Sequence, residues 1–278
     1  MKKKQHKQKL LVLIDFTKIS YRALKYAISL AKVINGKIIL LYVVLPRELV
    51  NDKNYSAGLK TQKIDKNKAE AQLKSIIEMI EAEKLSAEYI NTTGNFRTKL
   101  DECTTLFEPN LVVLGKSKNS TNQLGEATEY LLNQNNGNVL IISGDHEFRE
   151  DTQISMEGNG ESLNDQGSDF LLWLNEKTTP PICVFINHKK TVLKEVSLPK
   201  NWAELKKANF KICYKTKHCF STIDSIKKHI LDEKIELVCI ARKRLKTSFF
   251  ANLFSQHQST KEFINNIDIP VLIMGQAS

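Results

Sequence analysis

The stretch of this sequence best suited to hold a phosphate runs from residue 111 to residue 132, LVVLGKSKNSTNQLGEATEYLL. It begins as an apolar strand, turns at Gly115 and continues from Gly125 as a helix. Backbone amides at the start of a helix converge on an anion, and glycine lets the backbone approach it closely. The pattern predicts the fold of a phosphate loop between a strand and a helix.

Other residues of the same loop oppose phosphate binding. Glu126 falls in the first helical turn, where its carboxylate would satisfy the positive helix end, worth about 0.3–1 kcal/mol, and would repel a phosphate. Lys118 supplies a positive charge, but its side chain needs space that a glycine would leave open. Gly115 and Gly125 also suit tight turns without any ligand. We therefore expect a loop that has lost much of its affinity for phosphate.

No motif of a known catalytic or metal site accompanies this loop. The sequence has no GxxxxGK(S/T) loop, GxSxG turn or HExxH helix. The five cysteines are an odd number without a CxxC pair, which favours reduced thiols. Cys213, His218 and Cys219 fit no zinc spacing, and neighbouring strand residues such as His218 and Cys219 point to opposite faces. We predict neither catalytic residues nor a metal site; a slow ATPase, with Asp15 binding the metal ion, is the alternative.

The composition is that of a water-soluble globular protein. Of 278 residues, 41% are hydrophobic and 26% charged, and the longest apolar run, 38–45, is too short to span a membrane. A basic N-terminus without a small-residue cleavage site does not resemble a signal peptide, so we expect a cytoplasmic protein.

The net charge of +10 is unevenly distributed along the chain. Residues 1–144 carry +8, residues 145–169 carry −7, and residues 170–278 carry +9. Most of the positive charge is lysine spread along helices, which is typical of a solvated face and disfavours nucleic acid. The run Arg242-Lys243-Arg244 with Lys246 leaves a second alternative open, binding of nucleic acid or an acidic protein through the second domain.

Residues 1–144 alternate between apolar strands and amphipathic helices. This order predicts a doubly wound, mostly parallel sheet, because such sheets are built from successive strand-helix units. The expected strands are 10–15, 37–44, 86–91, 110–114 and 138–142. The expected helices are one after Thr17 or Ser20 that ends at Gly36, followed by 61–84, 97–107 and 126–132.

Residues 145–168 are acidic, polar and rich in glycine, and we interpret them as a linker in which 152–156 is at most a remnant edge strand. Alternation resumes in residues 169–278. There we expect strands at 182–187, 211–214, 236–241 and 269–274, and helices at 169–175, 202–208, 222–231 and 249–264. Residues 110–115 resemble 236–241, and 139–142 resemble 271–274, which indicates an internal duplication and two α/β domains.

The run LLVLIDFTKISYRALKYAISLAKVINGKIILLYVV, residues 10–44, together with NLVVLG, LGEATEYLL and VLIIS, resembles a universal stress protein domain. Residues 236–275 resemble the degenerate second half of tandem universal stress proteins. The resemblance implies two Rossmann-like domains, 1–144 and 169–278, packed as an intrachain pseudo-dimer through the last strands of their sheets. It also implies a stress-response scaffold or regulator, whose protein partner and further homodimerisation the sequence leaves open.

In that family an adenine nucleotide is held by an acidic residue at the end of the first strand and by a Gly-x2-Gly-x9-Gly-(Ser/Thr) loop. The resemblance places Asp15 at the ribose and Val43 at the adenine, and makes Gly115 the first glycine. Phe16 and Leu114 accompany them in the matching motifs. Lys118 replaces the second glycine, Gly125 comes too early, and Glu126 replaces the hydroxyl residue. ATP or AMP is therefore the candidate ligand of the first domain, bound weakly or no longer bound, although Asp15 also suits a helix cap and Val43 a core position.

Overall fold

The structure is a computed structural model that describes residues 7–44, 55–117, 124–157, 167–186, 209–214, 222–241 and 258–275. Its strands form one continuous ten-stranded sheet in the order β3-β2-β1-β4-β5-β10-β9-β6-β7-β8. Neighbouring strands are parallel except β5 and β10, which pair antiparallel. The predicted mixed α/β fold with a mostly parallel sheet is confirmed.

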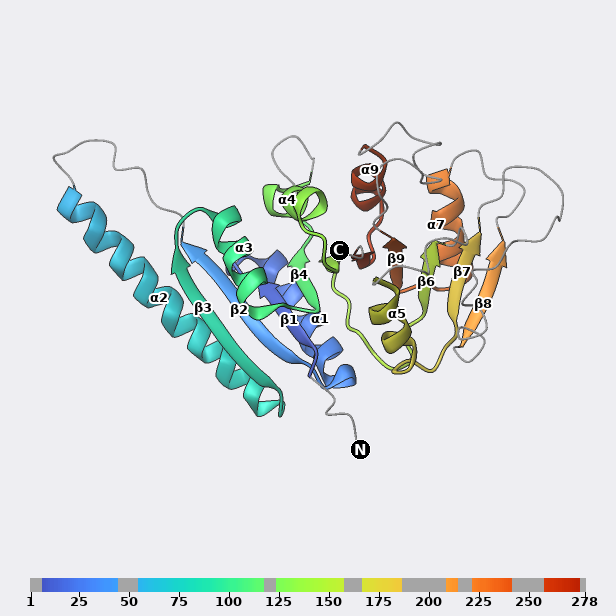
Figure 1. Ribbon diagram of the computed structural model, residues 1–278, viewed down its shortest axis with the longest axis horizontal. Coiled ribbons are helices and arrows are strands. Elements are labelled where there is room, and N and C mark those ends of the chain that lie inside the picture. The colour runs from blue at the N-terminus through green and yellow to red at the C-terminus, as the bar shows by residue number, and fades with distance from the viewer. Residues whose placement is uncertain are drawn as a thin grey trace.

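In chain order the first half comprises β1 (Lys9–Leu13), α1 (Lys18–Ile34), β2 (Lys37–Val44), α2 (Tyr55–Ala82), β3 (Ser86–Thr93), α3 (Phe96–Phe107), β4 (Leu111–Gly115), α4 (Glu126–Gln134) and β5 (Val139–Ile142). The second half comprises β6 (Ile154–Glu157), α5 (Gly167–Asn175), β7 (Ile182–Ile186), β8 (Phe210–Tyr214), α7 (Thr222–Asp232), β9 (Leu237–Ala241), α9 (Gln258–Asn266) and β10 (Val271–Met274). Figure 1 shows the two halves side by side, with β3 and β8 at opposite edges of the sheet.

Apolar strands explain why the sheet lies in the middle of the molecule. The five residues of β1, KLLVL, are buried after the first, as expected of a parallel strand covered on both faces. One core cluster joins one face of the sheet to α1, α2 and α5. A second cluster joins the other face to α3, α4, α7 and α9. Helices thus cover both faces of the sheet in the part of the chain that the structure describes.

The first helix is delimited by its own sequence. The side chain of Thr17 caps α1 by accepting a hydrogen bond from the amide of Ser20 at 3.3 Å. Asn35 ends the helix in the left-handed conformation, and its amide bonds to Ala31. Gly36, the next residue, packs tightly against Leu10, because a Cβ on Gly36 would lie 2.8 Å from the Leu10 side chain. The predicted start and end of this helix are therefore confirmed.

The two halves meet at the antiparallel pair β5 and β10. Leu140 pairs with Leu272 at its centre, flanked by Val139 opposite Ile273 and Ile141 opposite Val271. The strand order is the same read outward from this seam in either direction, with β4 and β9 next to it on the two sides. The sheet is continuous across the seam, and the division into two domains packed as a pseudo-dimer stays a prediction.

The segment 145–168 differs from the linker that its composition predicts. It contains β6, which lies inside the sheet between β9 and β7 and is not an edge strand. Phe148 is buried beside Tyr26, and its amide donates to the hydroxyl of Ser29 at 2.8 Å. The strand is difficult to recognise in the sequence because it is only four residues long and lies in an acidic segment. Its buried apolar residues are Ile154 and Met156.

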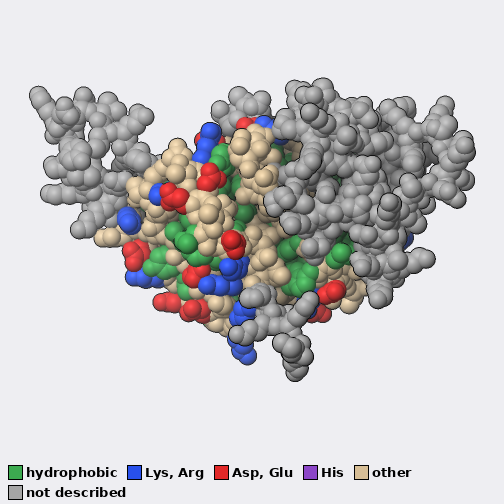
Figure 2. All heavy atoms as spheres, viewed as in Figure 1, with side chains coloured by type: hydrophobic (Ala, Val, Ile, Leu, Met, Phe, Trp, Pro, Cys, Tyr) green, Lys and Arg blue, Asp and Glu red, His purple; other side chains and the backbone are tan. Residues whose placement is uncertain are grey.

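Three further expectations fall wholly or partly outside the described residues. They are the helix at 202–208, the basic run 242–246, and the beginning of the helix at 249–264, of which α9 is the described part. Among described helices, none combines the length and apolar character needed to cross a membrane. Figure 2 shows acidic and basic side chains interspersed over the described surface of the first half.

Candidate functional site

A cavity of about 510 Å³ opens at the carboxyl ends of β1, β2 and β4. The chain proceeds from β1 to β2 on one side, whereas β4 joins β1 on the other side, so the strand order reverses here. Open α/β sheets bind ligands in the crevice at such a point, because the loops on the two sides diverge. The volume is in the range of small-molecule sites.

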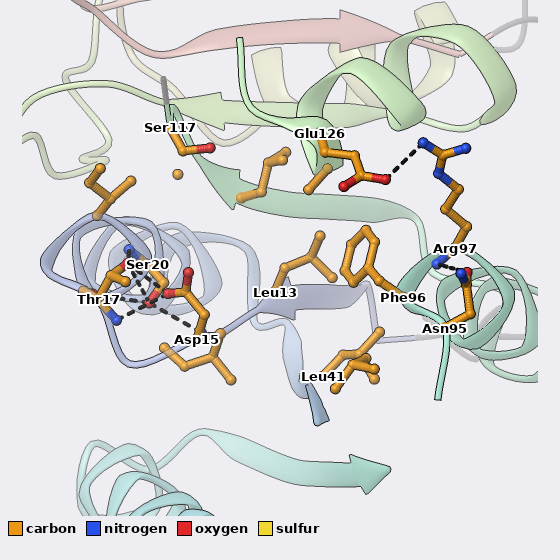
Figure 3. A pocket seen from close by; sticks show the side chains of 16 residues that line it. Leu13, Asp15, Thr17, Ser20, Leu41, Asn95, Phe96, Arg97, Ser117 and Glu126 are labelled. Carbon is orange, nitrogen blue, oxygen red and sulfur yellow. Dashed lines mark hydrogen bonds and ion pairs between the residues drawn. The ribbon is translucent and has the colours of Figure 1, made fainter. Parts of the chain in front are cut away.

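Asp15, Thr17 and Ser20 form the polar group at one end of this cavity (Figure 3). One carboxylate oxygen of Asp15 accepts hydrogen bonds from the Thr17 amide at 3.0 Å and the Thr17 hydroxyl at 2.6 Å. Burial opposes ionisation of Asp15, but hydrogen bonds from Thr17 and Ser20 outweigh it and lower the pKa of the carboxyl group. Asp15 is therefore an ionised acceptor that also fixes the turn into α1.

The middle of the cavity is apolar. Its walls come from β1, β2, β4 and the start of α3, and include Leu13, Leu41, Val43, Phe96 and Leu114. Figure 3 shows Leu13, Leu41 and Phe96 between the Asp15 group and the opposite end. A flat, uncharged ring is the kind of group that such walls accept.

Glu126 and Arg97 meet at the other end of the cavity (Figure 3). A guanidinium nitrogen of Arg97 lies 2.7 Å from a carboxylate oxygen of Glu126. The guanidinium also lies over the ring of Tyr130, 5.5 Å from its centroid, and the Tyr130 hydroxyl donates to Asp101 at 2.6 Å. That hydrogen bond raises the pKa of Tyr130. The ion pair thus joins the first turn of α3 to the first turn of α4 across the cavity.

Local sequence explains why Arg97 stands there. Asn95 caps α3, and its side-chain oxygen accepts from the amides of Arg97 at 3.0 Å and Thr98 at 3.3 Å. The cap starts the helix directly after β3, so Asn95, Phe96 and Arg97 all line the cavity. The sequence pattern predicts a helix at 97–107 but gives these residues no role in the site.

Gly115 and Gly125 serve close backbone packing in this structure. A Cβ on Gly115 would lie 2.6 Å from the carbonyl oxygen of Ile19, so only glycine lets α1 pack so closely on the end of β4. A Cβ on Gly125 would collide with the hydroxyl of Ser117. The Gly125 amide also donates to the Ser117 carbonyl at 2.9 Å, which closes the loop between β4 and α4.

The residues assigned to the site by sequence divide into three groups. Asp15, Val43, Leu114 and Gly115 line the cavity together. Phe16 does not line it: the residue has a left-handed backbone, with φ of 61°, and its ring packs on Tyr42 at 4.7 Å between centroids.

The third group lies at the loop itself. Gly125 caps α4 beside the cavity without lining it. Lys118 lies outside the described residues. The cavity residues that no motif indicated, Asn95 to Arg97 and Ser117, could have been found from the expectation that carboxyl ends of parallel strands share one edge of the sheet.

Lys116 extends from the cavity wall to the second half. Its side chain is only 5% exposed, and its ammonium group lies 2.6 Å from the carbonyl oxygen of Ile267 and 3.3 Å from that of Asn265. The carboxylate of Asp268 lies 3.4 Å away. A buried ammonium needs such acceptors, so Lys116 fixes the segment between α9 and β10 while its neighbours Gly115 and Ser117 line the cavity.

In the second half, Ser155 and His229 form a polar pair in an otherwise apolar core. The Ser155 hydroxyl lies 2.8 Å from a ring nitrogen of His229 and donates to the Cys183 carbonyl at 3.1 Å. Because the serine proton is directed to that carbonyl, the histidine ring is the donor of the pair and not a base acting on the serine. The adjoining cavity measures only about 20 Å³, room for about one water molecule.

Comparison with known proteins identifies the first half. Residues 7–143 match the model of the universal stress protein family. No curated protein matches the chain. A universal stress protein of known structure from Archaeoglobus fulgidus is 16% identical, with a TM-score of 0.73 over 97% of both chains. A protein from Pseudomonas aeruginosa described as functionally unknown is 14% identical, with a TM-score of 0.62 over 98% of this chain and 94% of its own. These two structures show a shared fold across both halves.

Proposed function

We propose that residues 7–143, a domain of the universal stress protein family, act as the ligand-responsive part of a non-catalytic stress-response scaffold or regulator. The ligand would be an adenine nucleotide or a related molecule, held weakly. The observation that carries this proposal is the cavity at the strand-order reversal, which combines an apolar middle with ionised Asp15 at one end.

The proposal of weak nucleotide binding rests on the opposite end of the cavity. A phosphate normally binds at a helix start, where free amides and the helix dipole favour negative charge. Here the first turn of α4 already contains Glu126 and Glu129. Of these two, Glu126 lines the cavity, whereas Glu129 is paired with Lys261. The Glu126 carboxylate offsets about 0.3–1 kcal/mol of the helix-end attraction, so the site is expected to favour phosphate less than a glycine-rich loop would.

The proposal that this domain is not an enzyme rests on the polar side chains that line the cavity, because they already form hydrogen bonds or ion pairs within the protein. Hydrolysis of ATP requires a carboxylate for the metal ion and a residue that positions water. Asp15 already accepts from Thr17, and Arg97 is paired with Glu126. A slow ATPase with Asp15 binding the metal ion is the runner-up, and it is tested in the same experiment.

We propose that the second half packs against the first as its intrachain partner. Three contacts besides the β5 and β10 pairing support this proposal. The Ser143 hydroxyl donates to the Ile269 carbonyl at 2.7 Å, the Gly275 amide donates to the Asn138 side chain at 2.8 Å, and Lys261 lies 3.2 Å from Glu129. Further homodimerisation and an unidentified protein partner belong to the same proposal. Binding of nucleic acid or an acidic protein through the second half would depend on residues 242–246, outside the described part.

The experiment measures ligand binding directly. The protein is purified natively and denatured, and mass spectrometry identifies any released adenine nucleotide; melting temperatures are then recorded with ATP and AMP up to millimolar concentration. A ligand at 100 times its Kd adds about 2.7 kcal/mol of stability, or about 5–10 °C for a chain of this size. We expect a small shift that appears only at millimolar nucleotide.

A pair of variants locates the binding. Val43→Phe should fill the cavity and abolish the shift, whereas Val44→Phe changes the neighbouring residue on the opposite face of β2 and should retain it. No shift with any adenine compound would overturn ligand binding. Turnover of ATP that Val43→Phe abolishes would favour the ATPase instead.

A further inference from the structure

We propose that Glu126 is a built-in competitor for anionic ligands, so that this cavity accepts an uncharged nucleoside and discriminates against its phosphate esters. The inference rests on the proposed function, because it concerns the ligand class of the same cavity. It goes further by assigning the charge selectivity to one side chain and its partner, Arg97.

The charges that line the cavity favour an uncharged ligand. Its described lining contains two carboxylates, those of Asp15 and Glu126, and one guanidinium, that of Arg97. Arg97 is the lining group that a phosphate would seek, since guanidinium pairs well with phosphate oxygens. It is already bound to Glu126 at 2.7 Å. An incoming phosphate must therefore displace a carboxylate that is attached to the protein.

The same carboxylate also stands at the start of α4. Gly125 caps this helix without a side-chain hydrogen bond, so the amides of the first turn lack a side-chain cap. Glu126 is the first residue of the helix and lines the cavity, which puts a negative charge where the helix dipole would attract an anion. Glu126 thus opposes phosphate binding both at the Arg97 guanidinium and at the start of α4.

The exposure of the ion pair sets the size of the effect. The Arg97 and Glu126 side chains are 54% and 74% exposed, so water screens their attraction and the pair can open. Effects of exposed charges on affinity are several-fold and not all-or-none. Glu126 should therefore shift the preference between a nucleoside and its phosphate by about 3- to 10-fold.

The remaining lining fits an uncharged nucleoside. The apolar walls formed by Leu41, Val43 and Phe96 suit a heterocyclic ring. Asp15 at the far end is an acceptor for hydroxyl groups. The 510 Å³ volume is sufficient for a molecule of that size.

The test compares adenosine with AMP by isothermal titration calorimetry on the full chain. The measured quantity is the ratio of the Kd for AMP to the Kd for adenosine. In the wild type this ratio should exceed one, and in Glu126→Gln it should fall by about 3- to 10-fold. In Glu126→Gln combined with Arg97→Gln the gain for AMP should be smaller than in Glu126→Gln alone, because the freed guanidinium is absent and only the relief at the start of α4 remains.

Glu129→Gln is the matched control. It removes a carboxylate from the same turn of α4, but Glu129 pairs with Lys261 and does not line the cavity. Its Kd ratio should remain within about twofold of the wild type, since exposed charges away from a site contribute little. A wild-type preference for AMP, or an unchanged ratio in Glu126→Gln, would overturn the inference alone. If neither ligand binds to the wild type or to Glu126→Gln, the proposed function falls, and the inference with it.

Discussion

At the scale of single residues, His229 shows how a titratable group is kept neutral inside the second half. Its ring stacks on Phe185 at 4.5 Å between centroids and bonds to Ser155, and the residue is buried. Burial lowers the pKa of His229, while nearby Glu233 and Asp232 act in the opposite direction and Lys211 reinforces the lowering. The neutral ring is thus part of the folded state.

This lowered pKa makes the stability of the protein depend on pH. The unfolded chain takes up a proton on His229 near the ordinary pKa of about 6.5, before the folded protein does. Stability should therefore fall as the pH drops through that value towards 5. In His229→Gln, which keeps a donor for Ser155 but does not titrate in this range, the melting temperature should decline less over pH 7.5–5. Parallel pH profiles for the two proteins would contradict this assignment.

At the scale of elements, the packing of α1 on the end of β4 positions the cavity. The carbonyl group of Ile19 lies so close to Gly115 that no side chain fits between them. The same helix begins at the Asp15 turn, so its placement also fixes the carboxylate. The geometry of the site therefore depends on one glycine whose role is close contact and not a left-handed backbone.

Gly115→Ala should separate the two elements and weaken both stability and ligand binding. An added methyl group in a closely packed position costs about 1–3 kcal/mol, which lowers the melting temperature by roughly 2–10 °C for a chain of this size. Gly137→Ala is the matched change, because among the described residues a Cβ there meets only the side-chain oxygen of Asn135, at 3.1 Å. Thermal denaturation of both variants tests the contrast, and equal losses would argue against it.

At the scale of the whole molecule, one contact between the two halves joins side chains of opposite charge at related positions, those of Glu129 and Lys261. Leu140 and Leu272 pair at the centre of the seam, and Glu129 and Lys261 occupy the same position relative to these two leucines. If two copies of the first half paired in the same way, Glu129 would face Glu129. The Glu129 and Lys261 pair therefore favours association of the first half with the second over association with a copy of itself.

A charge exchange tests this pairing. Glu129→Lys and Lys261→Glu should each destabilise the chain, because like charges would meet across the seam. The double exchange should restore most of the loss. The pair is partly exposed, so the coupling energy in a double-mutant cycle should be about 0.2–1 kcal/mol. Chemical denaturation of the four proteins measures it; additive losses would show that the two side chains do not interact.

Sequence patterns alone were sufficient where a signal is local or periodic. Runs of buried apolar residues located β1, β2, β4, β5, β9 and β10, and the cap at Thr17 with the turn at Gly36 delimited α1. The resemblance of its motifs also identified the first half as a universal stress protein domain, which the family match over residues 7–143 supports. The resemblance assigned Asp15, Val43, Leu114 and Gly115 to one nucleotide site, and all four line the same cavity at the strand ends; their role in binding stays a prediction.

Only the tertiary structure decided what depends on residues distant in the chain. β6 became an interior strand because β7 and β9 supply its hydrogen-bond partners, although its acidic flanks predicted a linker. Phe16 has a left-handed backbone and its ring packs on Tyr42, and Glu126 of α4 forms an ion pair with Arg97 of α3. Hydrophobic periodicity specifies which residues are buried. It does not specify which side chains meet, because those contacts are selected by the packing of elements far apart in the sequence.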